Sequence, residues 1–547
     1  MLIVFSLLIF SAAFCYFIYR RLRRYLRYLQ QEEYSSRRFL AWLLLSRAFD
    51  KRASAIFVAI SITAALFHGA AFLLLIVAGL CCLVVALFEP DSRKHGKIRL
   101  KMTARAQRIF NMTLAGSISA VLLFQASFYG ISSHGFAWPY WIAMTLLVQL
   151  IPISLGVVNS LLWPGELRRQ RRFVDEAKQK LETIKPIIVG VTGSYGKTST
   201  KFILNEVLST FTPTFTMENS INTLMGITRE VRERMLPGQT HAVLEMGAYQ
   251  RGSISRLCRL APPDAAIITS VGIMHLERFG STENVLLAKA ELAEAVPPSG
   301  ILVCNADNEG ARAIAQRHRK AKTYLYSIET CENVDCWMDG ILRVDGVTKF
   351  RVHWKSCQYQ GSTTLVGRPM LSNILAAFTM ASALGFPPKS ILAVISAVEP
   401  TDNRLQVKKV KKVTERKEVI EITELRDAYN SNPVGFVAAL NELDTMEGNR
   451  KILITPGMIE LGEEQYRANE RVAMIAAKIC DAVFIVGTAN SAALRAGLIS
   501  GGMDEKDILC FPGRDAAFSQ LRDNEREGDV VLIENDLPDL YEVVDKF

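Results

Sequence analysis

Residues 186–201 read PIIVGVTGSYGKTSTK, an apolar run that enters a glycine-rich turn and continues without helix breakers. The β-branched residues of the run are typical of a buried parallel strand. Glycines after such a strand let backbone N–H groups crowd around phosphate oxygens, and the N-terminus of the following helix favours anions. The stretch therefore predicts a nucleotide phosphate site in an α/β domain.

The residues of this turn have expected roles. Lys197 would neutralise the β- and γ-phosphates of ATP, and the Thr198 hydroxyl would bind Mg²⁺. The strict phosphate-loop pattern G-x-x-x-x-G-K-[ST] is not met, because Val191 stands at its first glycine. The alternative is a chance Gly-Lys-Thr at a turn, which the preceding strand disfavours. The residues expected to bind the nucleotide here are Gly193, Ser194, Gly196, Lys197, Thr198 and Ser199.

The composition of the chain indicates membrane segments. Its 547 residues exceed what one core can bury, and 50% of them are hydrophobic. The basic excess belongs to residues 1–185, which carry 24 Lys and Arg against 9 Asp and Glu, whereas the other 362 residues carry 40 against 45. Because these basic residues flank apolar runs, the positive-inside rule explains them better than binding to nucleic acid does.

The apolar stretches before residue 164 predict about five membrane spans. Residues 1–19 carry no charge and precede RRLRRYLR, the reverse of a signal peptide, so they predict an uncleaved anchor with its N-terminus outside. Residues 53–88 contain no charged residue and would measure about 54 Å as one helix, against a bilayer core of roughly 30 Å. Two short spans that turn near His68 are therefore expected. Residues 109–131 and 137–163 form a second pair.

This count places everything after residue 163 in the cytoplasm, and the protein in the cytoplasmic membrane. Four spans or a re-entrant hairpin are the alternatives. We expect a membrane region over 1–163, a basic cytoplasmic linker over 164–185, a central ATP-binding domain over 186–400 and a C-terminal domain over 401–547.

The ten cysteines do not indicate a metal or disulfide framework. No C-x-x-C pair occurs, and Cys15, Cys81 and Cys82 lie in apolar stretches. Scattered reduced thiols are expected instead.

Polar residues follow two further predicted strands. Residues 241–248 form an apolar strand that reaches Glu245, and residues 265–280 form another that ends near His275. A helix over 282–296 then carries Lys289. Open α/β sheets hold ligands at the carboxyl ends of their strands, so together with the phosphate loop these residues predict a metal site. The alternatives are a hydrogen-bonded loop histidine and a solvated helical lysine.

Eight segments resemble the Mur ligases, ATP-dependent amide ligases of cell-wall precursor synthesis, and most closely their MurF branch. The resemblance covers roughly residues 186–547 in the family's order, and it implies a phosphate-loop central domain and a Rossmann-like α/β C-terminal domain. The segments are TGSYGKTSTK (192–201), NSINTLMGI (219–227), EMGAYQRGSI (245–254), HLERFGSTENVLLAKAEL (275–292), LSNILAAF (371–378), NRL (403–405), DAYNSNP (427–433) and GMIELGEE (457–464).

The resemblance implies a catalytic set and a metal set. Arg404 would contact the γ-phosphate, and Lys289 would be the carbamylated lysine of the family, because a carbamate turns a cationic lysine into an anionic metal ligand. The implied catalytic residues are Lys197, His275, Lys289 and Arg404. The implied metal ligands are Thr198, Glu245, His275 and Lys289.

The remaining implied contacts concern the nucleoside of ATP. Asn373 would face the adenine and Asp427 the ribose. Tyr429, Asn430 and Asn432 would shape the loop beside the ribose. The expected cofactors are thus ATP and Mg²⁺.

The implied reaction joins an amine to a carboxylate. ATP first converts the carboxylate, a poor electrophile, into an acyl phosphate, and cations neutralise the charge of that transfer. An amine then displaces phosphate. The implied substrates are a muropeptide-type envelope precursor and an amino acid or dipeptide.

Several positions depart from the family pattern. Membrane spans occupy the place of the soluble domain that holds the uridine nucleotide. Arg426, Asn403 and Asn469 stand at positions where an acidic residue, a glycine and a histidine are usual, and 533–537 reads IENDL where the family has KGSR. These departures concern recognition of the UDP-sugar peptide and of the incoming dipeptide, and they leave the residues of ATP chemistry in place.

Three function classes follow. The first is a membrane-anchored amide ligase acting on a peptidoglycan or related precursor, with a lipid-linked acceptor preferred. The second is a ligase that needs a partner subunit or builds a poly-γ-glutamate-type polymer. The third is a non-catalytic, ATP-binding membrane scaffold, against which the intact Lys197, Glu245, His275 and Lys289 argue.

Overall fold

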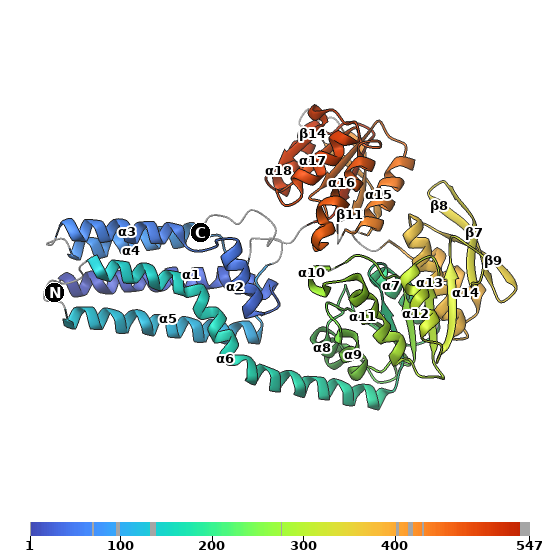
Figure 1. The fold of residues 1–547 in the computed structure, drawn as a ribbon, viewed down its shortest axis with the longest axis horizontal. Helices are drawn as coiled ribbons and strands as arrows, with labels where there is room; N and C mark the ends of the chain where they lie inside the picture. Colours follow the sequence, from blue (N-terminus) through green and yellow to red (C-terminus); the bar gives the residue numbers. More distant parts are fainter. Residues whose placement is uncertain are drawn as a thin grey trace. The chain divides into compact units, whose positions relative to one another are not determined.

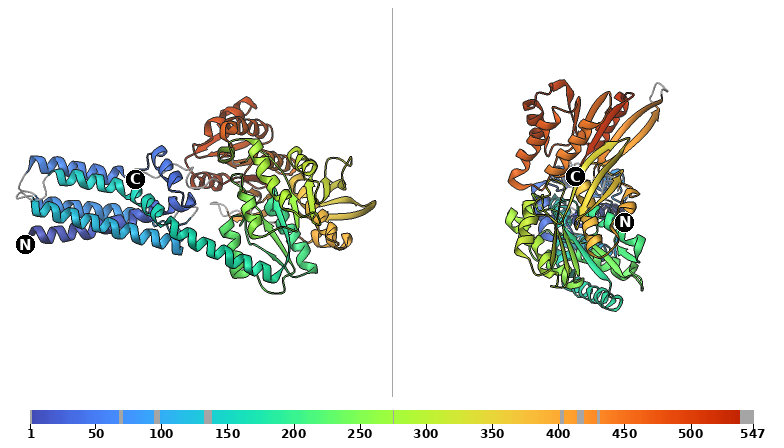
Figure 2. Two further views of the ribbon diagram at one scale, coloured as in Figure 1. Left: turned by 60° about the horizontal axis from the view of Figure 1, so that its bottom comes forward. Right: turned by 90° about the vertical axis from the view of Figure 1, so that its right-hand side faces the viewer.

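The computed structural model describes residues 2–67, 71–93, 99–131, 138–274, 276–400, 404–413, 419–428 and 431–536. Contacts divide the chain into a helical unit, residues 1–169, and an α/β unit, residues 170–537. Figure 1 follows the elements of both units along the chain, and Figure 2 shows them from two further directions.

The helical unit packs its helices around aromatic side chains. α1 contacts α4 and α5, and α3 contacts α4. Phe10 stacks on Phe14 with ring centroids 5.5 Å apart, and both rings meet the edge of Phe57. The helices are α1 (Leu2–Gln31), α2 (Ser36–Leu45), α3 (Lys51–Leu66), α4 (Ala71–Phe88), α5 (Ala104–Ile131) and the first part of α6 (Trp138–Ile184).

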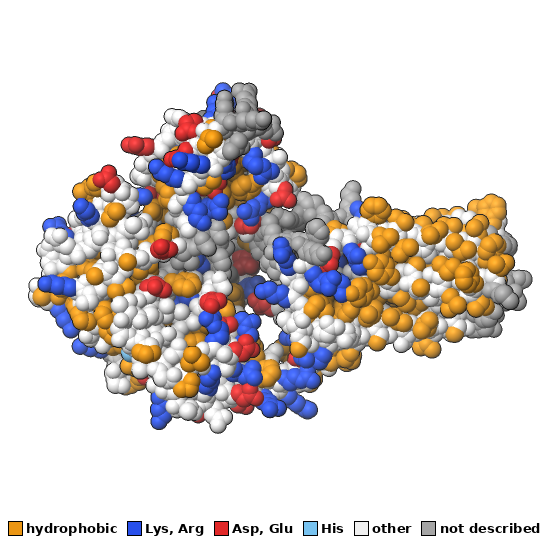
Figure 3. Space-filling view, turned by 180° about the vertical axis from the view of Figure 1, so that it is seen from behind, with side chains coloured by type: hydrophobic (Ala, Val, Ile, Leu, Met, Phe, Trp, Pro, Cys, Tyr) orange, Lys and Arg blue, Asp and Glu red, His pale blue; other side chains and the backbone are white. Residues whose placement is uncertain are grey.

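The outside of this unit is also hydrophobic. Leu66, Phe88, Leu123 and Leu161 each expose about 70% or more of their surface (70, 84, 69 and 70%). Figure 3 shows hydrophobic side chains covering the bundle, with Lys and Arg gathered at one end of it. A large apolar exterior is typical of a surface that contacts lipid or another protein.

Among the described residues, three helices are long and apolar enough to cross a membrane, by length and composition only. They are α1, residues 104–127 of α5, and α6, and the 72–88 part of α4 is a shorter apolar helix. Helices thus occur where the sequence predicted spans, although α1 continues beyond residue 19 to Gln31. The turn predicted near His68 lies outside the described residues, and the number of spans stays a prediction.

The segment predicted as a linker, 164–185, is helical. It continues α6 to Ile184, although Pro152 and Pro164 lie inside the helix. Ion pairs at i,i+4 spacing support its polar end, such as Arg172 with Glu176 at 3.0 Å. The buried Ala177 and Leu181 then pack this end into the core of the α/β unit.

A nine-stranded sheet forms the middle of the α/β unit. Its strand order is β2-β3-β1-β4-β5-β6-β7-β8-β9, parallel as far as β7 and antiparallel beyond. The β-branched run that we predicted as a buried strand is β1, which lies between β3 and β4. The strands are β1 (Ile187–Thr192), β2 (Thr214–Thr216), β3 (His241–Glu245), β4 (Ala265–Ile268), β5 (Ile301–Asn305), β6 (Lys322–Ser327), β7 (Cys336–Val344), β8 (Val347–Trp354) and β9 (Cys357–Thr363).

Helices cover both faces of this sheet. One core contains residues of α8, α9 and α11, and the other contains residues of α7, α13 and α14. The helices are α7 (Lys197–Phe211), α8 (Leu224–Arg234), α9 (Ser253–Leu260), α10 (Leu276–Phe279), α11 (Thr282–Ala295), α12 (Glu309–Arg317), α13 (Arg368–Ala383) and α14 (Pro388–Ser396).

The C-terminal part has its own sheet in the order β10-β11-β15-β12-β13-β14, in which only β10 is antiparallel to its neighbour. Separate cores lie on its two faces. This is a doubly wound α/β arrangement, as predicted. Its elements are β10 (Gln406–Val413), β11 (Val419–Asp427), α15 (Pro433–Thr445), β12 (Arg450–Thr455), α16 (Gln465–Ala476), β13 (Ala482–Val486), α17 (Ser491–Ser500), β14 (Ile508–Phe511), α18 (Arg514–Asn524) and β15 (Asp529–Glu534).

Candidate active site

The phosphate loop joins β1 to α7, and two of its glycines leave no room for a side chain. A Cβ on Gly193 would lie 1.9 Å from Thr269 Oγ1, and a Cβ on Gly196 would lie 2.3 Å from Asn373 Oδ1. Gly196 also has a φ of 79°, which L side chains rarely adopt. Both positions therefore require glycine, in agreement with the predicted loop.

The segment after β4 holds the loop in place. The Ser270 carbonyl accepts from Ser194 N at 2.8 Å, and Ser270 Oγ accepts from Tyr195 N at 2.8 Å. Ser194 Oγ in turn donates to the carbonyl of Gly272 at 3.0 Å. These bonds explain why the strand predicted over 265–280 was wrong: β4 ends at Ile268, because the next polar groups bind the phosphate loop and not a neighbouring strand.

Lys197 is the first residue of α7 and folds back over the loop. Its Nζ donates to the carbonyls of Gly193 at 2.6 Å and Ser194 at 3.2 Å. Burial lowers the pKa of the Lys197 ammonium; the Glu245 charge opposes this shift and the Arg404 charge adds to it. The side chain thus lies on the loop that would cradle phosphate.

Oxygen atoms gather beside Thr198. Its Oγ1 donates to Glu245 Oε2 at 3.0 Å and lies 3.2 Å from Ser220 Oγ. Asn222 Nδ2 donates to the other carboxylate oxygen of Glu245 at 2.9 Å. Glu245 is buried at the end of β3, next to the end of β1 in the sheet. The structure thus brings two of the implied metal ligands, Thr198 and Glu245, into contact, and their binding of a metal stays a prediction.

Lys201 is a residue of this site that the sequence reasoning missed. It is fully buried, its Nζ donates to the carbonyls of Met217 at 2.8 Å and Asn219 at 2.5 Å, and it lies 4.0 Å from Glu245 Oε2. Burial lowers its pKa to about 8, against the opposing pull of Glu245. The signal was available, because Lys201 stands four residues after Lys197 and so shares its helix face.

Lys289 lies in α11, as predicted, and is buried with 4% exposure. Burial and the neighbouring charge of Lys197 lower its pKa well below the usual value. Among the described residues it has no hydrogen-bond or ion-pair partner. Lys289 and Lys197 line one pocket, whose other lining residues are Gly193, Ser194, Asn222, Gly247, Ala248, Tyr249, Met274, Phe279 and Val285.

Asn373 lies on α13 against the start of α7. Its Oδ1 accepts from Thr200 Oγ1 at 3.2 Å and lies close over Gly196. Ser199 is buried in the first turn of α7. The structure therefore brings both residues to the phosphate loop, and the contact of Asn373 with adenine stays a prediction.

Arg404 and Asp427 lie close to each other at the start of β10 and the end of β11. Arg404 donates to Ser220 Oγ at 3.3 Å, which links it to the Thr198 and Glu245 cluster. Asp427 accepts from Leu405 N at 3.3 Å. Burial raises the pKa of Asp427 to about 6, although the Arg404 charge and the Leu405 bond oppose the shift.

Glu534 is a second carboxylate beside Asp427. The two residues are partners in the register of β11 and β15. Glu534 is fully buried and accepts from Ser431 Oγ, while its Oε2 has no hydrogen-bond partner. Burial, together with the Asp427 charge, raises the pKa of Glu534 well above its usual value.

Four predicted residues remain. Asn432 caps α15, where its Oδ1 accepts from Gly435 N at 2.9 Å, and its part in shaping the loop beside the ribose stays a prediction. His275, Tyr429 and Asn430 lie outside the described residues.

Two protein-family models match the two α/β domains of the chain. Residues 191–381 match the model of the Mur ligase middle domain, and residues 403–534 match that of the Mur ligase glutamate ligase domain. The UDP-N-acetylmuramoyl-tripeptide–D-alanyl-D-alanine ligase of Mycobacterium tuberculosis (strain ATCC 25618 / H37Rv) is 31% identical over 368 residues, 63% of this chain and 69% of that protein. The enzyme of that name from Bacillus subtilis (strain 168) is 28% identical, over 65% of this chain and 74% of its own.

Solved structures agree. A MurF ligase from Thermotoga maritima in complex with ADP superposes with a TM-score of 0.58 and 25% identity, over 67% of this chain and 80% of its own. MurF from Acinetobacter baumannii shares the fold, with a TM-score of 0.58, 20% identity, and coverage of 67% of this chain and 77% of its own. The predicted resemblance is confirmed. This chain belongs to the Mur ligase family of ATP-dependent ligases.

Proposed function

We propose that this chain is a membrane-anchored ligase that joins an amine to a carboxylate of a cell-envelope precursor through an acyl phosphate. One observation carries the proposal: Lys197, Lys289 and the Thr198–Glu245 pair converge on one phosphate loop. The relatives in the comparison are named for a UDP-N-acetylmuramoyl-tripeptide and D-alanyl-D-alanine, which supports this class of substrate.

The proposed chemistry needs an activated carboxyl group. An acceptor carboxylate oxygen attacks the γ-phosphorus of ATP, the bond to ADP breaks, and an acyl phosphate forms. The neutral amine then attacks the carbonyl carbon, the bond to phosphate breaks, and the amine nitrogen loses a proton. Lys197 and Arg404 are the cations beside the loop that would stabilise charge on the phosphoryl oxygens.

The residues beside the loop fit a Mg²⁺ ion. Mg²⁺ prefers oxygen ligands. The Thr198 hydroxyl lies 3.2 Å from the Ser220 hydroxyl and 3.0 Å from the Glu245 carboxylate, so three oxygen-bearing groups are close together. When bound there, Mg²⁺ would polarise phosphoryl oxygens and neutralise their charge. His275 is proposed as a further ligand from the family resemblance.

Carbamylation of Lys289 is the second part of the proposal. Its lowered pKa supports it, because only the neutral Nζ attacks the carbon of CO₂, forming an N–C bond and losing a proton. The resulting anion would lie in the pocket that Lys197 also lines, and would offset the repulsion between the two lysines.

The helical unit supports the choice of acceptor. Its apolar helices would hold the enzyme at a bilayer, where a lipid-linked precursor is concentrated and oriented. This confinement would replace the remote substrate contacts that a soluble nucleotide-binding domain makes in other members of the family.

The same anchoring predicts a topology. A reporter fused after Arg172 should behave as cytoplasmic, and one inserted near Ser133 as external. A cytoplasmic signal near Ser133 would contradict the five-span topology.

The test compares matched acceptors. Phosphate release and amide product are measured for the full chain in nanodiscs with a lipid-linked muropeptide, with its UDP-linked counterpart, and with a panel of amine donors. We expect the lipid-linked acceptor to be preferred and Lys197→Ala to abolish turnover with both. A preference for the UDP-linked acceptor would refute the choice of substrate, and turnover by Lys197→Ala would refute the phosphate-loop mechanism.

A further inference from the structure

Five arginines follow the apolar part of α1, in the segment RRLRRYLR at 20–27. Arg21 and Arg24 are buried, with 2% and 8% exposure, whereas Arg20, Arg23 and Arg27 are half-buried. The helix thus divides its positive charges between the interior of the bundle and an accessible face.

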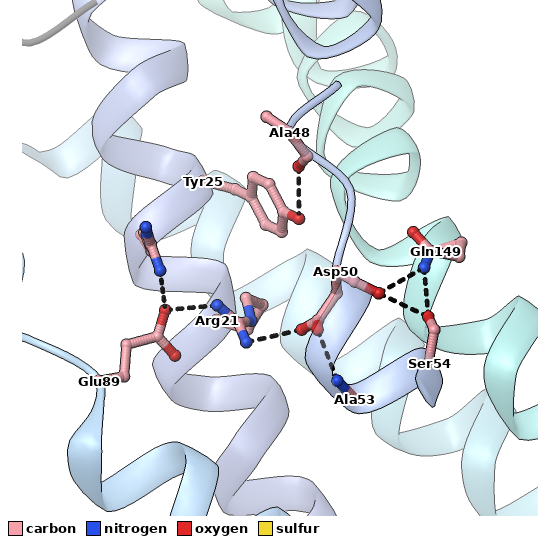
Figure 4. Close-up of polar contacts among 9 residues, drawn as sticks. Arg21, Tyr25, Ala48, Asp50, Ala53, Ser54, Glu89 and Gln149 are labelled. Carbon is pink, nitrogen blue, oxygen red and sulfur yellow. Dashed lines mark hydrogen bonds and ion pairs between the residues drawn. The ribbon is translucent and has the colours of Figure 1, made fainter. Parts of the chain in front are cut away.

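The buried arginines are neutralised inside the bundle (Figure 4). Arg21 pairs with Asp50 at 2.6 Å and with Glu89 at 2.9 Å, and Arg24 approaches the same Glu89 oxygen at 3.4 Å. Asp50 also caps α3 by accepting from Ala53 N at 2.8 Å. The carboxylates of Asp50 and Glu89 therefore pair with the buried arginines of α1, at the start of α3 and after the end of α4. They do not neutralise the accessible arginines.

Two of the accessible arginines, Arg23 and Arg27, lie on aromatic rings, whereas Arg20 donates to the Tyr16 hydroxyl at 3.2 Å and to the Glu89 carbonyl. The Arg23 guanidinium lies 4.1 Å from the ring centre of Tyr19 and 5.9 Å from that of Phe110. Among the residues that the structure describes, Arg23 has no hydrogen bond or ion pair, and its Nε is buried without a partner. Asp91, whose charge also reaches Arg23, is paired with Arg93 at 3.1 Å.

Arg105 of α5 has the same kind of setting. Its guanidinium lies 4.2 Å from the ring centre of Tyr34 and 5.4 Å from that of Trp163, and it donates to Asn159 Oδ1 at 3.1 Å. Its Nε is likewise buried without a hydrogen-bond partner. Among the described residues, Arg23 gives no hydrogen bond and Arg105 gives one, to Asn159, so both guanidiniums retain outer N–H groups that could donate to an anion.

Hydrogen bonds join α1 to the segment that leads into α5. Gln30 Nε2 donates to the carbonyl of Lys101 at 2.9 Å, and Lys101 N donates back to Gln30 Oε1 at 3.0 Å. Arg20, Arg23 and Arg27 share one face of α1 by their helical spacing, and Arg105 precedes by about one turn Phe110, the α5 residue whose ring Arg23 approaches. These four residues are here named the α1–α5 arginine face.

We propose that the α1–α5 arginine face binds the diphosphate of a polyprenyl-diphosphate-linked precursor. A guanidinium group can donate two parallel hydrogen bonds to phosphate oxygens, and an aromatic ring stacked against it fixes its orientation. The face adjoins the apolar part of α1, so a lipid tail would lie along the helices while its diphosphate meets the arginines. The inference rests on the proposed function and names the group by which its lipid-linked acceptor is held.

Binding of a fluorescent polyprenyl diphosphate to the full chain in phosphatidylcholine nanodiscs tests the proposal. The variant Arg23→Gln/Arg105→Gln should bind at least tenfold more weakly. Arg37→Gln/Arg52→Gln removes the same charge from exposed positions of the same unit and should bind within twofold of the wild type. Arg23→Lys/Arg105→Lys keeps the charge but not the fork, and should bind with intermediate affinity; it replaces the Gln variant if that one fails to fold.

Three outcomes would overturn the proposal. Equal weakening in the Arg37/Arg52 control would show that only total charge matters. Displacement of the probe by inorganic diphosphate at similar concentration would assign the face to a free anion. Loss of probe binding in phosphatidylglycerol nanodiscs would assign it to anionic lipid in general.

Activity separates this inference from the proposed function. The Arg23→Gln/Arg105→Gln variant should keep its turnover with a UDP-linked acceptor. If the wild type prefers the UDP-linked acceptor but the variant still loses probe binding, the acceptor proposal fails and the arginine face stands. If lipid-linked turnover is preferred and the variant binds the probe normally, the face fails and the proposed function stands.

Discussion

The Thr198 hydroxyl donates a hydrogen bond to a carboxylate oxygen of Glu245 at 3.0 Å, across 47 residues of sequence. The sheet makes this contact, because β1 and β3 are parallel neighbours with Val191 and Glu245 in register. Thr198 follows β1 by one loop, so both polar groups reach the carboxyl edge of the sheet, where ligands bind in open α/β folds. The pair thus places a hydroxyl and a carboxylate next to the phosphate loop, where we propose that Mg²⁺ binds.

Glu245→Gln should therefore lower turnover at least about 100-fold and raise the Mg²⁺ concentration needed for half-maximal ATP hydrolysis. The amide oxygen can still accept from Asn222 and the amide NH₂ can donate to the Thr198 hydroxyl, which then accepts, but the negative charge is lost. A Mg²⁺ titration of ATP hydrolysis measures the effect, with Glu233→Gln, an exposed residue of α8, as the matched control. An unchanged Mg²⁺ requirement in Glu245→Gln would remove Glu245 from the metal site.

The phosphate loop could be predicted from the sequence because its determinants are local. A β-branched strand, glycines with no space for a Cβ, and a helix without breakers follow one another in sixteen residues. The extent of β4 could not be predicted, because apolar residues continue beyond Ile268 to Met274 with only Thr269 and Ser270 as polar side chains among them, and only the fold shows that Ser270 and Gly272 bind the loop.

Contacts that cross the fold were also missed. Lys201 reads as an ordinary helical lysine, and its buried position depends on the carbonyls of Met217 and Asn219, which the chain brings from another segment. The continuous α6 was likewise read as a span and a linker, because Pro164 and the charges that follow it resemble a helix end. At Lys201 and along α6, tertiary packing determines a structure that the local sequence does not specify.

Lys289→Ala should be inactive and partly rescued by a short carboxylic acid, such as acetate at tens of millimolar. The reason is that the missing group would be an anion, since burial and the Lys197 charge lower the pKa of Lys289 and so favour the neutral amine that forms a carbamate. ATP hydrolysis coupled to amide formation measures the rescue, with chloride at equal ionic strength as the control. Full activity of Lys289→Arg would show that a positive charge suffices, and the carbamate would be ruled out.

The buried carboxylates of Asp427 and Glu534 should make stability depend on pH. The pKa of Asp427 is raised from 3.8 to about 6, so the folded state holds a proton that the unfolded state has released. The contribution of Asp427 to the free energy of unfolding is therefore fully present below about pH 4 and falls as the pH rises towards 6. Burial and the Asp427 charge raise the pKa of Glu534 well above its usual value, so this group acts in the same direction.

Asp427→Asn isolates this effect. The amide cannot ionise, so the variant should melt at a higher temperature than the wild type at pH 7 and at a similar temperature at pH 4. Melting of the full chain in detergent between pH 4 and pH 8 gives the comparison, and Asp481→Asn, a carboxylate at the opposite end of the same sheet, serves as the control. A difference between variant and wild type that does not change with pH would contradict the assignment.

Arg21 should be essential for the stability of the helical unit while its charge partners remain. Arg21→Met leaves Asp50 and Glu89 buried with much of their positive charge removed, and breaking such a buried pair costs about 3–5 kcal/mol. The triple variant Arg21→Met/Asp50→Leu/Glu89→Leu removes the acids as well, so it should recover part or all of the lost stability. Thermal unfolding of the full chain in detergent measures both, with Arg37→Met as the exposed control. If the triple variant is less stable than Arg21→Met, the acids stabilise the bundle by contacts other than their pairing with Arg21, such as the cap that Asp50 makes on α3.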